Sequence, residues 1–345
     1  MSASGGCGAH CAYRTASHAT TAAALARHYI LDTAQLPAYL HAAVARLEHD
    51  AETAAFLAAC RPNWCVDALA GLLRSCFSLT DVNGLLVRGQ MFVLSRAHAA
   101  ALLGPALAAA RAAHGGPLRL LDVGAGDGEV TARLASAVDS VHATEVSAVM
   151  GARLRARGYG VSVGPLISRA VLPTDGVFDV VALMNLLDRC DHPREMLADA
   201  ARLARRGTGR ILIALVLPYA EFVEEGARRR GVRGPLPMGG ARCNDGATLE
   251  ASLAAFVERV VHPLGLEVER LARLPYLCRG DAKQPYYVLS DAILVLRHAV
   301  GSDGEAVCQW PVEHVDEACD RVVLLGGHET VKIRSLGGGA GEGRL

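Results

Sequence analysis

Two short groups of residues carry side chains suited to chemistry, and each group follows an apolar run. In the first group, Asp122 lies in the run Leu118–Val123, and Gly124, Gly126 and Gly128 follow at alternate positions before a helical pattern begins. Glycines let a backbone turn adopt positive φ and approach a ligand closely, and a helix start presents free N–H groups. The spacing G-x-G-x-G differs from the G-x-G-x-x-G of dinucleotide-binding turns. The turn therefore predicts a nucleotide-like ligand of another kind.

Acidic residues around this turn narrow the choice of ligand. Asp122, Asp127 and Glu129 would repel a pyrophosphate, so a cationic, phosphate-free ligand fits better. Glu145 ends a second buried-strand pattern 19 residues after Gly126, where an acid can accept hydrogen bonds from both ribose hydroxyls. Together these features predict the S-adenosylmethionine site of a class I methyltransferase.

The second group, Asn185 and Asp188, follows the buried-strand pattern Phe178–Met184. We expect the end of this strand to lie beside the end of the first strand, and therefore beside the methyl donor. A methyltransferase needs an acceptor atom with a free lone pair in line with the transferred methyl. Ordinary turn residues and a helix cap are the alternative explanation for this pair.

The elements that must position both groups alternate between strand and helix from about Leu118 onward. This order predicts an α/β fold, the Rossmann-like sheet of about seven strands of class I S-adenosylmethionine-dependent methyltransferases, with ligands at the carboxyl ends of the strands. The chain divides into a flexible N-terminus at residues 1–28, an α-helical cap at 29–105, a methyltransferase domain at 106–300 and a partly flexible C-terminal extension at 301–345.

Four local interpretations complete the expected architecture. The segment Leu79–Ser95, with two glycines and little periodicity, is expected to be a functional loop, and Glu224–Gly246 a surface insertion. Two adjacent strands are expected at Gly265–Arg273 and Tyr286–Arg297, with the turn-rich stretch Leu274–Pro285 between them. Asp191 is expected to cap the helix that Pro193 opens.

Composition excludes several other functions. The formal net charge is zero and the 35 basic residues are scattered, which predicts no nucleic-acid partner. No apolar run reaches the roughly 18 residues of a membrane span. Cys7, His10 and Cys11 have no second Cys/His pair at zinc spacing, so no metal site is predicted.

The expected location is intracellular, either cytoplasmic or organellar. Ten cysteines in a chain of 345 residues do not form a dense disulfide framework, which favours a reducing compartment. Before Asp32 the chain has no acid and two arginines, a weak resemblance to an organellar transit peptide. A disordered surface tail is the alternative.

The residues quoted so far also resemble a known family. The segments LLDVGAGDGEVT (120–131), ATE (143–145) and NLLDRCD (185–191) are similar to the DREV methyltransferases, the protein-histidine N-pros-methyltransferase family. The resemblance extends from about Leu79 to Leu296. Further matching segments are Asn83–Leu86, Arg88–Gly89, Met91–Val93, Ala214–Pro218, Arg273–Cys278, Gly280–Asp281 and Tyr286–Leu289.

This resemblance implies methyl transfer from S-adenosylmethionine to the pros nitrogen of histidine in His-x-His motifs of target proteins. It implies that one set of residues holds the cofactor: Asp122, Gly124, Gly126 and Glu145, to which Asp127 of the same turn is added. It further implies that Asn185, Asp188 and Tyr287 hold the target imidazole. The chemistry is consistent, because an acceptor on the tele N–H leaves the pros nitrogen free to attack.

Some observations leave the acceptor open. The family has an Asn-Glu-Trp segment where this chain has Val163–Ile167, which puts contacts to adenine or substrate there in doubt. A methyltransferase of a small molecule and a catalytically silent, cofactor-binding scaffold are the alternatives, although retention of Asp122, Glu145, Asn185 and Asp188 argues against the scaffold. None of the 13 histidines is two positions from another, so self-methylation is not predicted.

Overall fold

The computed structural model describes residues 25–61, 63–73, 79–164, 171–172, 174–225, 228–281 and 284–299. These residues all belong to one compact unit, Met1–Pro311. The predicted flexible N-terminus up to residue 24, the cluster Cys7, His10 and Cys11, the segment 165–167 and the C-terminal extension lie outside the described residues.

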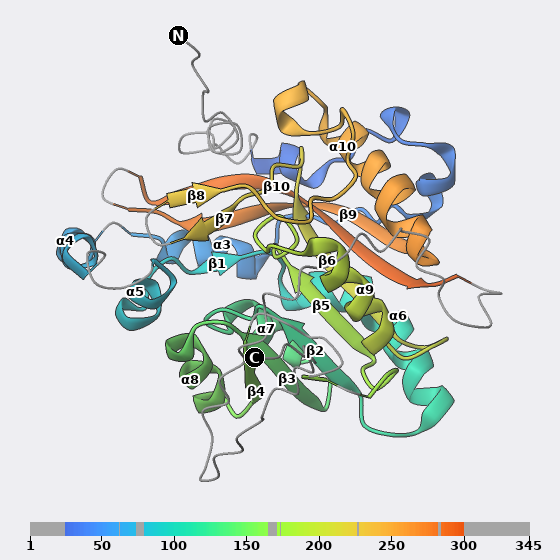
Figure 1. Cartoon of the computed structure of the whole chain (residues 1–345), viewed down its shortest axis with the longest axis horizontal. Coiled ribbons are helices and arrows are strands. Elements are labelled where there is room, and N and C mark those ends of the chain that lie inside the picture. Colours follow the sequence, from blue (N-terminus) through green and yellow to red (C-terminus); the bar gives the residue numbers. More distant parts are fainter. Residues whose placement is uncertain are drawn as a thin grey trace, which may run out of the picture. The chain divides into compact units, whose positions relative to one another are not determined.

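The described residues form an eight-stranded sheet in the order β1-β9-β10-β6-β5-β2-β3-β4 (Figure 1). Strands β2 to β6 are parallel, and β10, β9 and β1 continue the sheet in antiparallel pairs. The predicted sheet had about seven strands, and the additional one is β1. The strands of this sheet are β1 (Met91–Phe92), β2 (Arg119–Val123), β3 (Ser140–Glu145), β4 (Gly160–Val163), β5 (Val180–Met184), β6 (Arg210–Val216), β9 (Leu266–Arg279) and β10 (Tyr286–His298).

Helices precede the sheet and connect its strands. The α-helices are α3 (Ala51–Ala59), α4 (Trp64–Leu73), α5 (Leu79–Leu86), α6 (Arg96–His114), α7 (Glu129–Ala135), α8 (Ala148–Ala156), α9 (Pro193–Leu203) and α10 (Leu249–Phe256). Local signals define the ends of α6, because Ser95 and His98 form a capping box and Gly115 ends the helix in the left-handed conformation. Short 3-10 turns are η1 (Arg27–Tyr29), η2 (Thr33–Gln35), η3 (Ala38–Ala43), η4 (Cys243–Asp245) and η6 (His262–Leu264), and Val257–Val261 forms a π-helical turn, η5.

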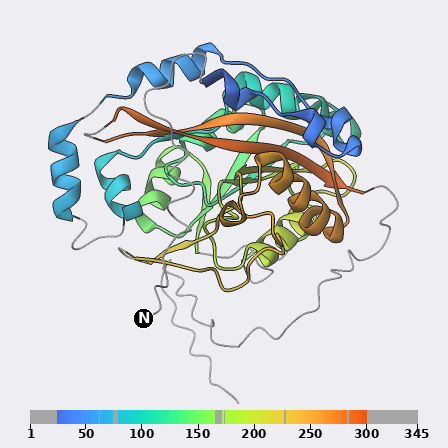
Figure 2. The ribbon, with the colours of Figure 1, turned by 90° about the horizontal axis from the view of Figure 1, so that it is seen from above.

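Alternating side chains of the strands build one core on each face of the sheet. On β2, Leu121 and Val123 pack with α9 and α10, whereas Leu120 packs with α6. Figure 2 shows α6 and α10 on opposite sides of the long strands β9 and β10. The sheet is therefore covered on both faces, as the alternating order of strands and helices predicted.

Three local predictions were wrong. The expected loop at Leu79–Ser95 begins with helix α5, and β9 continues through Pro275 to Arg279. Strand β9 pairs with β10 on one side, and on its other side β1 pairs only with Leu277 and Cys278. Pro275 therefore has a strand on one side alone, and the N–H that proline lacks removes no hydrogen bond to β1. Asp191 does not cap α9, because its carboxylate pairs with Arg230 through both oxygens.

The segment 224–246 contains strand pairing and buried side chains, which a surface insertion would lack. Strands β7 (Val223–Glu225) and β8 (Arg228–Arg230) form a two-stranded antiparallel sheet within it. Further along, Leu236 and Met238 are 1% and 0% exposed and belong to the core beneath α9 and α10. Two apolar residues without periodicity give no sequence signal for this burial.

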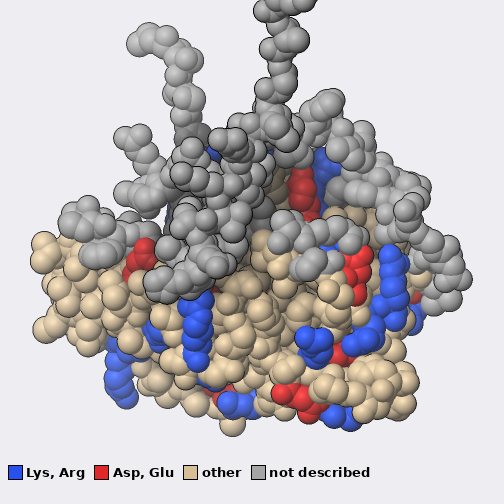
Figure 3. Space-filling view, turned by 60° about the horizontal axis from the view of Figure 1, so that its bottom comes forward, with Lys and Arg blue, Asp and Glu red and all other residues tan. Residues whose placement is uncertain are grey.

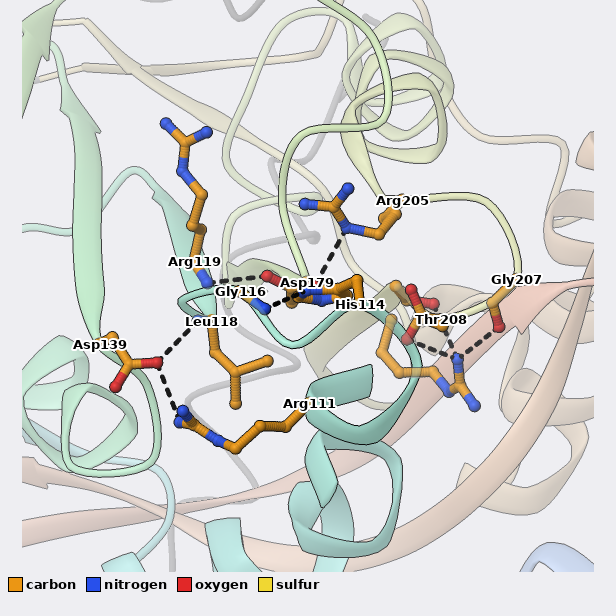
Figure 4. A network of polar contacts seen from close by, with 12 residues as sticks. Arg111, His114, Gly116, Leu118, Arg119, Asp139, Asp179, Arg205, Gly207 and Thr208 are labelled. Atoms are coloured by element: carbon orange, nitrogen blue, oxygen red, sulfur yellow. Dashed lines mark hydrogen bonds and ion pairs between the residues drawn. The ribbon is translucent and has the colours of Figure 1, made fainter. Parts of the chain in front are cut away.

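A buried polar network joins strands at the amino ends of β2 and β5 (Figure 4). The carboxylate of Asp179 accepts a hydrogen bond from the backbone N–H of Arg119 at 2.9 Å and one from the guanidinium of Arg205 at 3.2 Å. His114 Nε2 lies 2.9 Å from the same carboxylate. Because Asp179 directly precedes β5, this network anchors the end of that strand opposite to Asn185.

Candidate active site

The two predicted groups of chemical residues meet at the carboxyl edge of the sheet. β2 and β5 pair in parallel, so the turn after Val123 lies beside the turn after Met184. A side chain at Gly124 would place its Cβ 2.9 Å from Leu186 Cδ1. The glycine turn and the Asn185–Asp188 segment are therefore in direct contact.

The glycine turn has the backbone conformation that its sequence indicated. Gly124 and Gly126 have φ angles of 69° and 57°, in the left-handed region that favours glycine. A Cβ at Gly126 would meet no atom within 4 Å. The backbone at Gly126 thus borders open space that a ligand can enter.

Asp122 lies beneath this turn, 1% exposed. Its Oδ2 accepts a hydrogen bond from the hydroxyl of Thr131, and Oδ1 has no partner among the described residues. Burial raises the pKa of Asp122 to about 7, the hydrogen bond from Thr131 opposes the shift, and Glu145 adds to it. Asp122 is therefore a carboxyl group that a neighbouring cation can ionise near neutral pH.

Glu145 is bound to the glycine turn itself. Its Oε2 accepts the N–H of Gly126 at 2.9 Å, and Oε1 accepts the N–H groups of Val146 and Ser147 at 2.9 and 3.0 Å. A carboxylate offers about four acceptor sites, so part of its capacity is left for a ligand. Asp127 accepts the N–H of Glu129 at 3.0 Å and thus orders the start of α7.

Asn185 is held in an uncommon conformation directly after β5. Its φ is 55°, one of two positive values at non-glycine residues in the described part of the chain, and its N–H donates to Ala214 O at 2.9 Å. Asparagine tolerates this region better than most residues. Its Nδ2 donates to Asp291 Oδ2 at 2.8 Å, whereas its Oδ1 is shielded from solvent and has no partner among the described residues.

Asp188 lies one turn further along, 1% exposed. Its Oδ2 lies 2.8 Å from Arg189 Nη1, while Oδ1 accepts no hydrogen bond from the described residues. Burial raises the pKa of Asp188, the guanidinium of Arg189 opposes the shift, and Glu221 adds to it. One oxygen of the Asp188 carboxylate is thus paired with Arg189, and the other can accept a hydrogen bond from a ligand.

Tyr287 lies elsewhere along the same edge. It is half-buried on β10, opposite Cys278 of β9, and its hydroxyl donates to Asp281 Oδ2 at 3.0 Å. Four residues, roughly 13 Å along the strand, separate it from Asp291 on the same face of β10. The structure therefore brings Asn185 and Asp188 together and places Tyr287 further from them.

Asp291 is a further candidate site residue, outside the two groups predicted from the sequence. It is 0% exposed, contacts Asn185 and has a second oxygen with no partner in the described part of the chain. Burial raises its pKa well above the usual range, and repulsion by Asp188 adds to this shift. The available signal was its position as the only charged residue in the apolar run Val288–Leu296.

The parallel sheet, the glycine turn and the acid at the end of β3 define a Rossmann-like class I methyltransferase that uses S-adenosylmethionine. The family model described as DREV methyltransferase matches residues 28–298. The chain belongs to this DREV methyltransferase family.

Solved structures provide more distant likenesses. A chain from the complex of the Haloferax volcanii Trm112 methyltransferase activator is 17% identical over 40% of this chain, with a TM-score of 0.27, and this chain spans 61% of its length. A chain from Bacillus halodurans C-125, described as a methyltransferase, is 15% identical, with 56% and 97% of the two chains covered and a TM-score of 0.36. The N-terminal domain of EvdMO1, solved with S-adenosylhomocysteine bound, is 23% identical, with 56% and 81% covered and a TM-score of 0.31.

The residues at the glycine turn fit the cofactor. S-adenosylmethionine carries a cationic sulfonium and a ribose, and the turn offers the unpartnered oxygen of Asp122, the remaining capacity of Glu145 and the open space at Gly126. On the face shown in Figure 3, basic side chains are interspersed with acidic ones rather than gathered in one patch. No helix within the described residues is long and apolar enough to cross a membrane.

Proposed function

We propose that this protein transfers a methyl group from S-adenosylmethionine to the pros nitrogen of histidine in His-x-His motifs of target proteins. The supporting observation is that Asn185 and Asp188 each have a buried oxygen that accepts no hydrogen bond from the described residues. A buried acceptor without a partner costs about 1–3 kcal/mol. A ligand that donates an N–H to one of these oxygens would remove the cost of that oxygen.

A neutral imidazole has the required chemistry. It carries one N–H and one lone pair, so an acceptor that takes the tele N–H leaves the lone pair on the pros nitrogen. When bound, S-adenosylmethionine supplies a methyl group on a positively charged sulfur, which accepts the electron pair of the S–C bond as the pros nitrogen bonds to the methyl. The ring becomes an imidazolium, and loss of the tele proton completes the reaction.

Asn185 and Asp188 have separate tasks in this proposal. Oδ1 of Asn185 or of Asp188 accepts the tele N–H and so selects the reactive tautomer. The carboxylate of Asp188 stabilises the positive charge that develops on the ring, and Arg189 holds this carboxylate through its other oxygen. Because both groups are held by neighbours before any ligand binds, little reorganisation is needed during the reaction.

Tyr287 has a more peripheral task. Its hydrogen bond to Asp281 orients the ring near the turn between β9 and β10. From there it can contact the peptide that flanks the target histidine, either by stacking or by hydrogen bonding. The turn between the strands thus contributes to recognition of the substrate.

Peptide methylation tests the proposal directly. The protein is incubated with labelled S-adenosylmethionine and either a His-Ala-His or an Ala-Ala-His peptide, and the methylated nitrogen is identified by fragmentation against pros-methyl and tele-methyl standards. We expect label on the first peptide alone and on its pros nitrogen.

Two outcomes contradict the proposal. Absence of label on both peptides, while calorimetry shows that the cofactor binds, excludes this acceptor and favours a small molecule or a scaffold. Methyl transfer from the labelled cofactor to a metabolite extract then separates those two. Label on the tele nitrogen excludes the tautomer selection assigned to Asn185 and Asp188.

A further inference from the structure

We propose that Asp291 is a positioning residue that holds the side-chain amide of Asn185, so that the amide oxygen faces the methyl acceptor. The inference rests on the proposed function for the identity of that acceptor, an imidazole N–H. It adds a residue from the middle of β10, 106 positions from Asn185 in the chain, to the machinery at the end of β5.

The neighbours of Asp291 within the sheet give no structural reason for a carboxyl group. It lies opposite Val216 of β6 and Leu274 of β9, and it is flanked on its own face by Leu289 and Ile293. Burying a carboxyl group among such apolar neighbours costs free energy unless other groups compensate it. An apolar side chain would pack better here, so the carboxyl group has another task.

That task follows from the symmetry of the asparagine side chain. The NH₂ and oxygen ends of an amide have nearly the same shape, and only the neighbours decide which end points where. Oδ2 of Asp291 accepts the hydrogen bond from Nδ2 of Asn185 at 2.8 Å, so the NH₂ end of Asn185 faces Asp291 even when the other oxygen of Asp291 carries a proton. The oxygen of Asn185 must then point away from Asp291.

The backbone conformation limits the positions that the side chain of Asn185 can take. Its N–H is bound to Ala214 O at 2.9 Å, and its left-handed φ of 55° fixes the direction of the Cα–Cβ bond. The oxygen that results from this arrangement has no partner among the described residues. Asp291 therefore orients the amide oxygen of Asn185 as an acceptor for the ligand.

A double-mutant cycle tests whether Asp291 acts through Asn185. Asp291→Leu removes the carboxyl group, keeps the branching of the side chain at Cγ and lets the amide rotate. We expect kcat/KM for the His-Ala-His peptide to fall about tenfold, as for loss of one buried hydrogen bond, with unchanged affinity for S-adenosylmethionine. In an Asn185→Ala background, Asp291→Leu should have no further effect, because the amide is already gone.

Two further variants control for folding. Asp291→Asn keeps the shape of the side chain if Asp291→Leu does not fold, and we expect a smaller loss of about threefold, because its amide can either accept or donate. Asp179→Asn replaces a buried carboxyl group at the opposite end of β5. It should lower the melting temperature and leave kcat/KM unchanged, which separates lost stability from lost positioning.

A spectroscopic measurement does not require any methyl acceptor. In protein labelled with ¹⁵N-asparagine, the side-chain NH₂ signal of Asn185 is identified by its loss in Asn185→Ala. We expect one proton of this group to be shifted downfield and protected from exchange, and to lose both properties in Asp291→Leu.

The outcomes separate this inference from the proposed function. Multiplicative losses in the cycle, or an Asn185 NH₂ signal that Asp291→Leu leaves unchanged, overturn the positioning role. A wild-type protein that labels neither peptide overturns the proposed function instead, and the NH₂ signal still decides whether Asp291 holds the amide.

Discussion

At the scale of single residues, the site combines groups that are buried but incompletely satisfied. Asp122, Asn185, Asp188 and Asp291 each have an oxygen that accepts no hydrogen bond from the described residues. Such groups cost folding free energy and are retained where a ligand or a reaction uses them. The first pair of predictions concerns two of these carboxyl groups.

We predict that Asp188→Asn lowers kcat roughly 100-fold, within the range for loss of a positioned acid or base, and changes the affinity for S-adenosylmethionine less than about twofold. The variant keeps the shape of the side chain and removes the charge that stabilises the developing imidazolium. Single-turnover kinetics and calorimetry measure the two quantities. Asp199→Asn, at an ion pair with Arg202 on α9, is the matched control and should change neither. Equal losses of turnover and affinity in Asp188→Asn would contradict the assigned role.

The raised pKa of Asp122 predicts how stability depends on pH. The folded chain without cofactor keeps a proton on Asp122 up to about pH 7, whereas the unfolded chain loses it near the ordinary value of 3.8. Folding therefore binds a proton in this window. This contribution to stability is fully present below the lower value and is lost as pH rises toward 7, with a slope of at most about 1.4 kcal/mol per pH unit.

Urea unfolding of the wild type and of Asp122→Asn between pH 4.5 and 7.5 checks this prediction. The difference in the free energy of unfolding should move in favour of the variant as pH rises, because asparagine does not titrate. Parallel pH profiles of the two proteins would show that Asp122 titrates normally in the folded state.

At the scale of elements, helix α5 supports the turn that follows Glu145 at the end of β3. The hydroxyl of Ser147 donates to Asp81 of α5 at 2.5 Å, and the N–H of the same serine donates to Glu145. Gly84 brings α5 close to α8, since a Cβ there would lie 3.0 Å from Val149 Cγ1 and 3.1 Å from Met150 Sδ. The position of α5 is thus connected to the cofactor turn through one serine.

We predict that Gly84→Val pushes α5 away from α8 at a cost of about 1–3 kcal/mol, as overpacking does. The affinity for S-adenosylmethionine should fall several-fold with it, because Ser147 moves. Gly104→Val is the matched control, since a Cβ at this position of α6 meets nothing within 4 Å. Calorimetry and thermal melting of both variants measure the effects, and equal changes in both would disconnect α5 from the cofactor site.

At the scale of the whole molecule, the two ends of the parallel strands have different tasks. The candidate active site lies at the carboxyl ends of β2, β3 and β5, and a buried network around Asp179 holds the amino ends of β2 and β5 (Figure 4). The five-residue strand β5 lies between the two regions. Stability and activity should therefore be separable by mutation.

We predict that Asp179→Asn lowers the free energy of unfolding by roughly 2–4 kcal/mol, because it leaves the guanidinium of Arg205 without its buried carboxylate. Urea unfolding measures this loss. Methyl transfer at a temperature where the variant is folded should stay within about twofold of wild type, since Asp179 is at the far end of the strand from Asn185. A comparable loss of turnover would mean that the two ends of β5 are coupled.

The sequence alone determined the features that depend on neighbours in the chain. Apolar runs identified the buried parallel strands, and alternate glycines with Asp122 and Glu145 identified the turn and its cofactor, because strand, turn and helix signals are local. The family resemblance, carried by the same segments, agrees with the family match. The residues proposed to hold an imidazole were likewise named from a turn and a strand, and their roles stay predictions.

Only the tertiary structure decided the contacts between distant segments. The pairing of β10 with β6 places Asp291 beside Asn185. The β7–β8 segment brings Arg230 into an ion pair with Asp191, so Asp191 does not cap helix α9. Strand β9 can continue through Pro275 because the short strand β1 does not reach this residue. Leu236 and Met238 are buried because they pack in the same core as α9 and α10. A pattern of residue types indicates which face of an element is buried, but the partner of a buried polar group is set by strand register and packing across the fold.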